Sequence, residues 1–316
     1  MKIHSPDDNK NSSSGQHCLH DIFISFIILT INSEKYLDLC LNSIISQKFS
    51  RFEIIIVDGG STDKTLQIIN NYTKKFREMK LIRAPGSSIG YAREIGTKQA
   101  IGDICAYIDS DCELPSDSWL SSMISGFDSP AIAAVWTLGT YHIHDVSILR
   151  YSILSNPFRN NVPPIVTKRN YIPVGTGHIL IRKEIIQKVG GFRDLNAAED
   201  IDLTYKIVNH GYQIRYMKGC EVFHYHVTSL RQLIHKNRRN ISGGMNSQIW
   251  KRTYLSPRNL DFFLSLTIVY PIFYSLYRTI VDKDWAWLWH PVVTIFKIFS
   301  ALSVFLCHVI PSQKKF

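Results

Sequence analysis

Apolar residues follow two alternating rhythms along the first third of the chain. Continuous apolar runs, typical of strands buried on both faces, alternate with segments whose apolar residues recur at helical spacing. The runs predict strands at residues 22–30, 52–57, 81–83 and 104–108. The helical spacing predicts helices at residues 35–46, 66–76 and 89–100. This alternation indicates an α/β fold with a mostly parallel sheet between helices, whose ligands bind at the carboxyl ends of the strands.

The pattern becomes mixed between residues 113 and 228. Short apolar runs predict strands at residues 131–138, 177–182, 213–217 and 221–224, and residues 200–209 are expected to form a helix. Residues 156–170 contain three prolines and are expected to form a loop. We therefore expect a first half at residues 21–112 and a second half at residues 113–228. The polar residues 1–20 are expected to form a disordered tail.

Two long apolar stretches follow a basic segment near the end of the sequence. The segment at residues 229–259 has seven Lys and Arg and no acid between residues 231 and 258. Because a bilayer core needs about 20 helical residues, residues 260–311 predict a hairpin of two membrane helices with both ends in the cytoplasm. A hairpin lying in the membrane interface is the alternative. Pro271 interrupts the first stretch, and Lys297 in the second costs roughly 2.5–3.5 kcal/mol in a spanning helix.

Composition and charge narrow the classes of function. Of 316 residues, 45% are hydrophobic and 20% are charged, so a packed core is expected and global disorder is excluded. A net charge of +10 favours anionic partners: phosphates, acidic lipids or nucleic acid. The six cysteines form no CxxC pair and no zinc-like spacing with histidine, which indicates a reducing compartment and no disulfide framework.

The strongest chemical signal is the pair Asp109 and Asp111, directly after the predicted strand at residues 104–108. Two carboxylates one residue apart can reach a single cation, and hard oxygen ligands suit Mg²⁺ or Mn²⁺. A solvated loop explains many such pairs. The position after a buried parallel strand favours the metal site here.

Two glycine-containing turns are expected at the same edge of the sheet. Residues 57–63 read VDGGSTD, and Asp58 in this turn can bind a base or a ribose. An ordinary strand–turn–helix connection is the equal alternative. Residues 86–93 read GSSIGYAR, where a helix N-terminus together with Arg93 can bind a diphosphate. No GxGxxG follows a strand, so the dinucleotide-binding fingerprint is absent from the sequence.

The second half contains an acidic pair and a histidine pair. Glu199 and Asp200 open a predicted helix, where the helix dipole favours acids and where one acid can serve as a general base. His224 and His226 are two residues apart on a predicted strand and therefore point to one face. A structural role is the alternative to a metal ligand for these histidines.

Taken together, these motifs resemble a family 2 glycosyltransferase. The resemblance covers about residues 23–244 and rests on an ordered series: VDGGSTD, GYAREIG, DSD, GTGHILIRKE, GGF, AEDIDL and VFH. It implies the GT-A fold, a mostly parallel Rossmann-like sheet flanked by helices, here followed by the C-terminal membrane hairpin. With the hairpin, the expected location is the cytoplasmic membrane, with the catalytic domain facing the cytoplasm.

The resemblance also implies a role for each matching residue. Asp200 is expected to be the catalytic base, and residues 175–178 are expected to shape the acceptor and donor-sugar side of the cleft. Asp111 and His224 are expected to hold Mg²⁺ or Mn²⁺, with His226 in reserve. The residues expected to bind the nucleotide-sugar are Thr30, Glu34 and Asp58 at the base and ribose, Arg93 at the diphosphate, and Asp109 at the ribose and metal.

The implied reaction is an inverting, metal-dependent transfer of one sugar from a UDP- or GDP-sugar to a hydroxyl of a lipid-linked or glycan acceptor. Two departures from the family pattern matter. Residues 58–61 read Asp-Gly-Gly-Ser instead of Asp-Asp-Gly-Ser, which leaves one carboxylate. Residues 232–240 have no tryptophan to match the Gln-x-x-Arg-Trp motif of processive synthases, which favours single transfer.

Three alternatives remain at this point. A polyprenyl-phosphate sugar synthase would use the lipid phosphate itself as the acceptor. A nucleotidyltransferase shares the parallel half-sheet and metal carboxylates, but it releases pyrophosphate. A basic, membrane-tethered nucleic-acid-binding protein would suit the charge, but no recognised nucleic-acid-binding module is visible in the sequence, so no nucleic-acid partner is expected.

Overall fold

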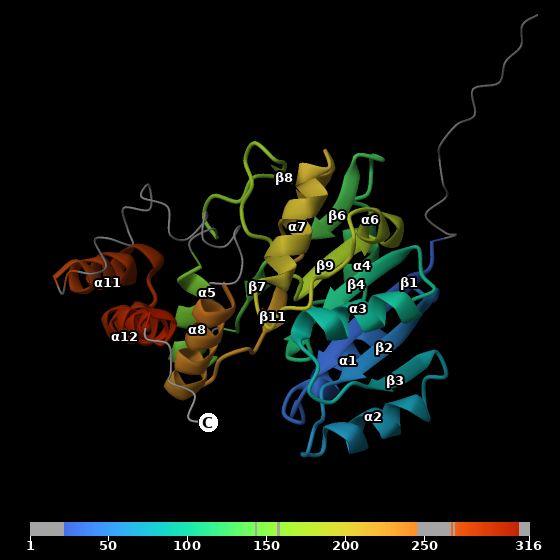
Figure 1. Cartoon of the computed structure of the whole chain (residues 1–316), viewed down its shortest axis with the longest axis horizontal. Coiled ribbons are helices and arrows are strands. Elements are labelled where there is room, and N and C mark those ends of the chain that lie inside the picture. Colours follow the sequence, from blue (N-terminus) through green and yellow to red (C-terminus); the bar gives the residue numbers. More distant parts are fainter. Residues whose placement is uncertain (1–21, 143, 157–158, 245–266, 268, 310–316) are drawn as a thin grey trace, which may run out of the picture.

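The computed structural model describes residues 22–142, 144–156, 159–244, 267 and 269–309. Its centre is an eight-stranded sheet (Figure 1). Across the sheet the strands are β3(Met79–Arg83), β2(Phe52–Asp58), β1(Ile24–Thr30), β4(Ile104–Ile108), β9(His178–Arg182), β6(Ile132–Trp136), β10(Gln213–Tyr216) and β8(Ile165–Val166). The first four strands are parallel, whereas β9 runs antiparallel to both β4 and β6. The predicted mostly parallel sheet is confirmed, and both predicted halves of the chain contribute to it.

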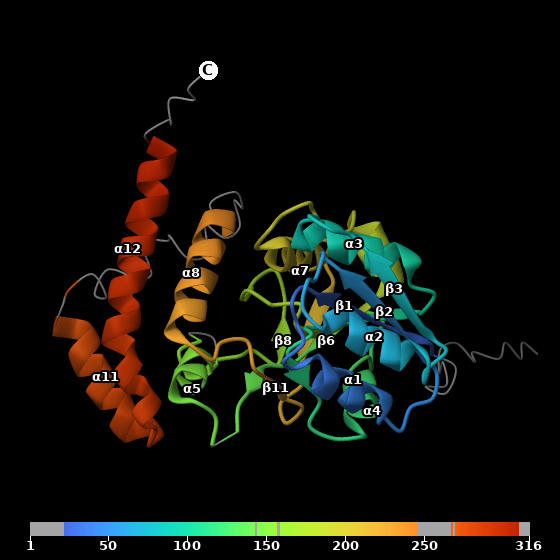
Figure 2. The same ribbon diagram turned by 90° about the horizontal axis from the view of Figure 1, so that it is seen from below.

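Helices cover both faces of this sheet (Figure 2). One face carries α1(Leu37–Ile45), α2(Thr65–Thr73) and α4(Trp119–Ile124), and the other carries α3(Ile89–Gln99), α6(Lys183–Lys188) and α7(Glu199–Asn209). In β1, Phe26 and Ile28 pack toward α1, whereas Ile27 packs toward α3. Burial on both faces explains why β1, β2 and β4 are apolar at most positions instead of every second one.

The strand order changes direction between β1 and β4, and ligands of open α/β sheets bind at such switch points. A second, three-stranded sheet adjoins this point and consists of β5(Cys112–Glu113), β11(Val222–His224) and β7(Gly139–Thr140). In its antiparallel register, His224 pairs with Cys112. The small sheet therefore brings the histidine motif next to the acids that follow β4.

A separate group of helices lies beside the sheet domain (Figures 1 and 2). It comprises α5(Ser147–Leu154), α8(Leu230–Gly244), α11(Val269–Asp282), the short 3₁₀ helix η2(Trp285–Trp289) and α12(His290–Val309). Tyr151, Leu233, Trp287 and Val293 form part of its own small core. The predicted basic segment at residues 229–259 is thus helical over the part that α8 occupies.

The turn between α11 and α12 is fastened to α5. Arg150 Nη2 donates to Asp284 Oδ1 at 2.9 Å, and Trp289 Nε1 donates to Ser147 Oγ at 2.9 Å. In a spanning hairpin with both ends in the cytoplasm, this turn would be separated from α5 by a bilayer core about 30 Å thick. The predicted hairpin of two spanning helices is therefore not supported. Among the described residues, no helix combines the length and the apolarity that a membrane span requires.

Parts of several predicted segments lie outside the described residues, among them the tail at residues 1–20, residues 245–259 of the basic segment, and residues 260–266 and 310–311 of the two apolar stretches.

Candidate active site

Asp109 and Asp111 lie at the carboxyl end of β4, as the sequence predicted. The backbone N–H of Asp109 donates to the carbonyl of Gly177 at 2.9 Å, which fixes the loop against β9. A Cβ at Gly177 would lie 2.5 Å from Asp109 Oδ2, so a larger residue here would displace the Asp109 carboxylate. The two carboxylates are thereby held at the switch point of the sheet.

His224 reaches this acidic pair from the small sheet. Its Nε2 lies 3.3 Å from Asp111 Oδ1 and 3.7 Å from Asp109 Oδ2. His226 instead places Nε2 3.0 Å from Ser152 Oγ on α5. Of the two histidines that the sequence proposed, His224 is the one beside Asp111.

This cluster has the donors that a divalent cation needs. One ligand atom each from Asp111, Cys112 and His224 lie within 4.8 Å of one another. Burial, with further repulsion from Asp111 and Asp109, raises the pKa of the Cys112 thiol well above its usual value, and a neutral thiol is a poor ligand. The remaining oxygen and nitrogen donors fit Mg²⁺ or Mn²⁺.

Glu199 and Asp200 form the first turn of α7, and Arg93 connects them to the cluster. Arg93 Nη1 pairs with Glu199, and Arg93 Nη2 lies 3.3 Å from Asp109 Oδ1. Asp200 faces Gly175, where a Cβ would lie 3.6 Å from Asp200 Oδ2. The structure therefore brings the predicted base and the predicted metal site to one edge of the sheet.

The acidic pair on α7 holds its protons unusually tightly. Burial and the neighbouring Asp200 raise the pKa of Glu199 to about 7, although Arg93 opposes this rise. Burial also raises the pKa of Asp200, again against the charge of Arg93. A carboxylate with a raised pKa is better matched to accepting a proton near neutral pH than an ordinary surface aspartate.

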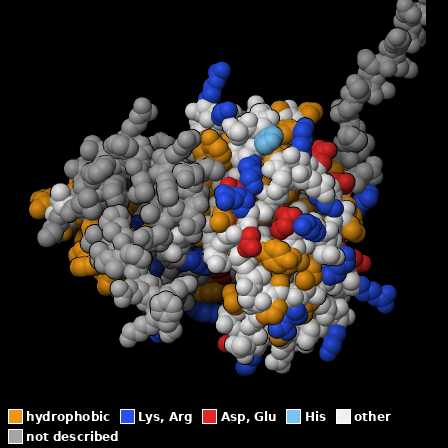
Figure 3. All heavy atoms as spheres, in the orientation of Figure 1, with side chains coloured by type: hydrophobic (Ala, Val, Ile, Leu, Met, Phe, Trp, Pro, Cys, Tyr) orange, Lys and Arg blue, Asp and Glu red, His pale blue; other side chains and the backbone are white. Residues whose placement is uncertain are grey.

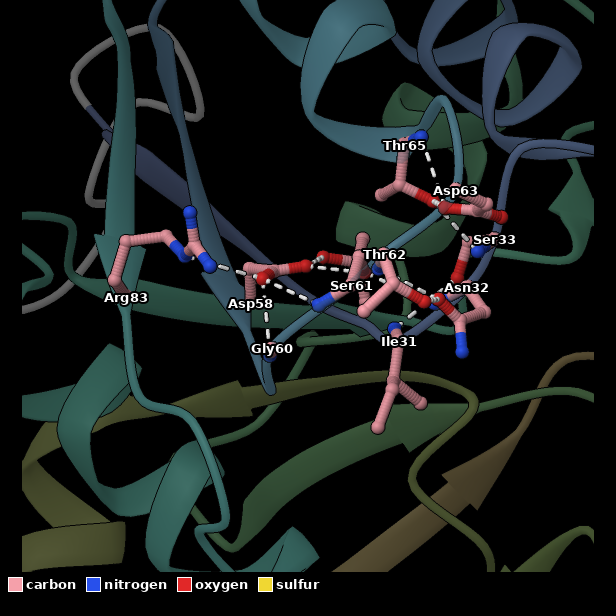
Figure 4. Close-up of polar contacts among 11 residues, drawn as sticks. Ile31, Asn32, Ser33, Asp58, Gly60, Ser61, Thr62, Asp63, Thr65 and Arg83 are labelled. Carbon is pink, nitrogen blue, oxygen red and sulfur yellow. Dashed lines mark hydrogen bonds and ion pairs between the residues drawn. The ribbon is translucent and has the colours of Figure 1, made fainter.

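Asp58 has a very different environment at the end of β2 (Figure 4). It is fully buried and accepts hydrogen bonds from Gly60 N and Ser61 N, both at 3.0 Å, and from Thr30 Oγ1 at 3.1 Å. The Ser61 hydroxyl also donates to it, and Arg83 Nε lies 3.2 Å away. Burial alone would raise the pKa of Asp58, but these hydrogen bonds hold it below its usual value.

Glu34 is exposed and lies in the loop before α1. Its Oε2 accepts from Lys64 N at 2.9 Å, and its backbone N–H donates to Asp63 Oδ2 at 3.2 Å. The structure thus connects Thr30, Glu34 and Asp58 through loops at the ends of β1 and β2. Their contact with the base and ribose of a nucleotide stays a prediction.

Two further side chains lie near the cluster: Lys236 from the predicted basic segment, and His178 from residues 175–178, which were predicted to shape the cleft. Burial lowers the pKa of Lys236 on α8 to about 8, against the attraction of Asp111. Burial and His224 lower the pKa of His178 to about 4, and its ring lies 5.7 Å from that of His224. Lys236 is one of seven Lys and Arg between residues 231 and 258, and no local pattern distinguishes it from the others.

The family signature described as glycosyl transferase family 2 matches residues 25–190, and that described as glycosyl transferase family group 2 matches residues 136–310. The chain belongs to glycosyl transferase family 2. The predicted family is confirmed, and with it the expectation of an enzyme of the glycosyltransferase class.

Two curated relatives illustrate the range of similarity. Glycosyltransferase AglE of Haloferax volcanii is 27% identical over 207 residues, which are 63% of this chain and 66% of AglE. Poly(ribitol-phosphate) beta-N-acetylglucosaminyltransferase TarS of Staphylococcus aureus is 39% identical over 90 residues, 28% of this chain and 16% of TarS. The chain thus matches less than two thirds of the length of either relative.

Solved structures of similar proteins share the fold. Mannosyltransferase PcManGT of Pyrobaculum calidifontis, in complex with GDP-Man and Mn²⁺, is similar with a TM-score of 0.63 and 15% identity, over 90% of this chain and 87% of that one. Residues 1–349 of S. aureus TarS with UDP-GlcNAc give a TM-score of 0.54 and 19% identity, over 93% and 94%. At these identities the likeness confirms the GT-A-like fold alone.

Proposed function

We propose that this family 2 enzyme transfers one sugar from a nucleotide-diphospho-sugar to an acceptor hydroxyl, with inversion at the anomeric carbon. The observation that carries the proposal is the junction of Asp109, Asp111 and His224 with Glu199 and Asp200 at the switch point of the sheet. A cation-binding cluster beside a buried base is the arrangement that such a transfer needs.

Asp111 and His224 are the residues that would hold a divalent ion, and Asp109 is close enough to assist. Such an ion supplies positive charge against the diphosphate of the leaving group when it is bound. Lys236 faces the same acids and provides a further positive charge for a phosphate. PcManGT binds Mn²⁺ together with GDP-Man, which supports a divalent ion here.

Asp200 acts as the general base in this proposal. It accepts the proton of the acceptor hydroxyl while that oxygen forms a bond to the anomeric carbon. The bond from the anomeric carbon to the diphosphate oxygen breaks, and the nucleoside diphosphate leaves with the electron pair. A single displacement of this kind inverts the anomeric centre. The raised pKa of Asp200 suits it to accepting the proton.

The nucleotide stays open between UDP and GDP, since TarS binds UDP-GlcNAc and PcManGT binds GDP-Man. The lack of a tryptophan at residues 232–240 supports single rather than processive transfer.

We further propose a lipid-borne acceptor and a place at the cytoplasmic membrane, with the catalytic domain facing the cytoplasm. Exposed large apolar side chains gather on the C-terminal helices, at the left edge of the molecule in Figure 3. They include Phe273, Leu276 and Ile280 on α11, Trp285 on η2 and Phe299 on α12. Apolar helices beside the basic α8 suit the interface of an anionic membrane. They therefore support the alternative in which the hairpin lies in the membrane interface.

The test is a panel of UDP- and GDP-sugars, first for binding with Mn²⁺ by thermal shift and then for transfer to a lipid extract by mass spectrometry. We expect one donor to stabilise the protein and one sugar to appear on a lipid. EDTA should stop transfer, and Mn²⁺ or Mg²⁺ should restore it. A sugar joined to the lipid by a phosphodiester would identify a polyprenyl-phosphate sugar synthase. Binding of no donor, or release of pyrophosphate from a nucleoside triphosphate, would overturn the proposal.

A further inference from the structure

The N-terminal end of α3 is covered by the segment that leads into α7. Gly90 N donates to Leu195 O at 2.9 Å, and Tyr91 N donates to Ser88 Oγ at 3.0 Å. The Ser88 hydroxyl in turn donates to Asp194. These donors at the start of α3, which the sequence predicted for a diphosphate, are therefore engaged within the protein.

Two further contacts fasten the same segment to α3. A Cβ at Gly90 would collide with the carbonyl of Arg193, so only glycine permits the observed approach of the two backbones. One turn along the helix, Glu94 Oε2 accepts a hydrogen bond from Phe192 N at 3.1 Å. Ser88 and the first six residues of α3 thus hold residues 192–195 along their length.

Arg93 completes this set of contacts. Its side chain is 8% exposed, and its two terminal nitrogens are directed at Glu199 and Asp109. One guanidinium therefore spans from the end of β4 to the start of α7. A buried arginine with both terminal nitrogens engaged has little freedom left to turn toward a phosphate.

Two contacts outside Arg93 also hold the first turns of α7: Arg193 Nη1 lies 3.4 Å from Asp202 Oδ1, and the Tyr171 hydroxyl donates to Ile201 O at 3.0 Å. Ala198 precedes the helix at φ 65°, and α7 has no side-chain hydrogen bond at its N-cap. Of the contacts at this helix start, the pair of Glu199 with Arg93 is the one that ties it to Asp109 at the end of β4. Asp200 is the next residue, so its carboxylate moves with this junction.

We infer that Arg93 is a positioning residue: together with Glu199 it sets the place of the Asp200 carboxylate relative to Asp109, and it does not bind the donor diphosphate. This inference rests on the proposed function for its kinetic consequence. The statement that Arg93 does not bind the diphosphate can be tested by nucleotide binding alone, whether or not the protein transfers a sugar.

The experiment compares Arg93→Gln, Arg93→Lys and Glu199→Gln with the native protein. Because a misplacement of about 1 Å costs about 100-fold in rate, we expect kcat to fall by about that factor in Arg93→Gln. The donor KM and the Kd of UDP or GDP with Mn²⁺, measured by calorimetry, should stay within about twofold, because Arg93 makes no contact with the bound nucleotide in this proposal. The double variant Arg93→Gln/Glu199→Gln should be no worse than the poorer single variant.

Lys98→Gln is the matched control. It removes a cation from the same helix, and Lys98 pairs only with Glu94, at the surface, among the ion pairs of the described residues. It should behave as the native protein. If Arg93 binds the diphosphate, the Kd of UDP or GDP rises about tenfold or more in Arg93→Gln while Glu199→Gln binds normally, and the inference is wrong. Additive losses in the double variant would also overturn it. If Arg93→Gln does not fold, Arg93→Lys and Glu199→Gln supply the same comparison. A native protein that binds a nucleotide but transfers no sugar would refute the proposed function and leave the binding test intact.

Discussion

Two acidic sites at the same edge of the sheet are built on opposite principles. At the end of β2, Asp58 is buried with every partner in place: two backbone N–H groups, two hydroxyls and Arg83. At the end of β4, four carboxyl groups face a smaller number of cations. These carboxyl groups belong to Asp109, Asp111, Glu199 and Asp200.

The pKa values reflect this difference. The pKa of Asp58 is lowered, because its charge is satisfied by hydrogen bonds that exist before any ligand arrives. At the second site, burial close to other acids raises the pKa values of Glu199 and Asp200, whereas His224 lowers that of Asp111 against the effect of burial. A site of the second kind gains when a cation binds or a proton moves, which marks it as the site of chemistry. The hydrogen bonds of Asp58 support its turn, and its contact with a nucleotide stays a prediction.

Replacing Asp111 with Asn is expected to have the largest effect. The change removes one charged ligand from the cluster while keeping its shape, so the loss of cation binding should lower kcat by roughly 10⁴-fold. Initial rates at saturating Mn²⁺ and calorimetric titration with Mn²⁺ measure the two effects. Asp117→Asn, at an exposed ion pair with Lys48, is the control and should be silent. Normal Mn²⁺ affinity in Asp111→Asn would remove Asp111 from the cation site.

Replacing Asp200 with Asn tests the other part of the same site. An amide cannot accept the proton of the acceptor, so kcat should fall by about 10³-fold. The Kd of UDP or GDP should be unchanged, because Asp200 is not expected to touch the nucleotide. Single-turnover transfer and calorimetry separate the two quantities. Turnover near the native rate would show that another group takes the proton.

Patterns along the sequence predicted the parts of the fold that are buried on both sides. The strand at residues 104–108 has the same limits as β4, and the helix at residues 200–209 differs from α7 by one residue. Continuous apolar runs are reliable there because both faces of the sheet carry helices. The two-residue strands β5 and β7 and the six-residue helices α4 and α6 are too short to show a period, so they were not predicted.

The site was predictable in its acids and histidines but not in their partners. Asp109 and Asp111 follow a strand, and this position is readable from local sequence. The ion pair of Arg93 with Glu199 joins residues 106 positions apart, which no local pattern reveals. The C-terminal helices misled for a related reason. Their apolar residues predicted two membrane-spanning helices, whereas Trp287 and Val293 pack against α5 and α8.

Asp58→Asn tests the fully hydrogen-bonded site at the end of β2. The buried carboxylate loses its charge beside Arg83 and its hydrogen-bond donors, so the free energy of unfolding should fall by about 3 kcal/mol. Urea denaturation measures this loss, and the rate at saturating donor should change little. A rise in donor KM with unchanged stability would instead support the predicted contact of Asp58 with the nucleotide.

The smallest expected effect is a shift in pH dependence, and it tests the crowding of the acids directly. Asp200 accepts a proton only when it is ionised, so kcat should rise with pH through its raised pKa. Glu199→Gln removes the neighbouring acid and frees Arg93 to stabilise the ionised Asp200, so both changes lower the pKa of Asp200. The acidic limb of the profile should therefore move toward lower pH, even though the plateau of kcat is lower. Profiles of log kcat between pH 5 and 9, with Lys98→Gln as the control, measure the position of the limb separately from the height of the plateau. A limb that stays in place, or moves to higher pH, would mean that Glu199 does not govern the charge of Asp200, and the contrast with the satisfied Asp58 would lose its physical basis.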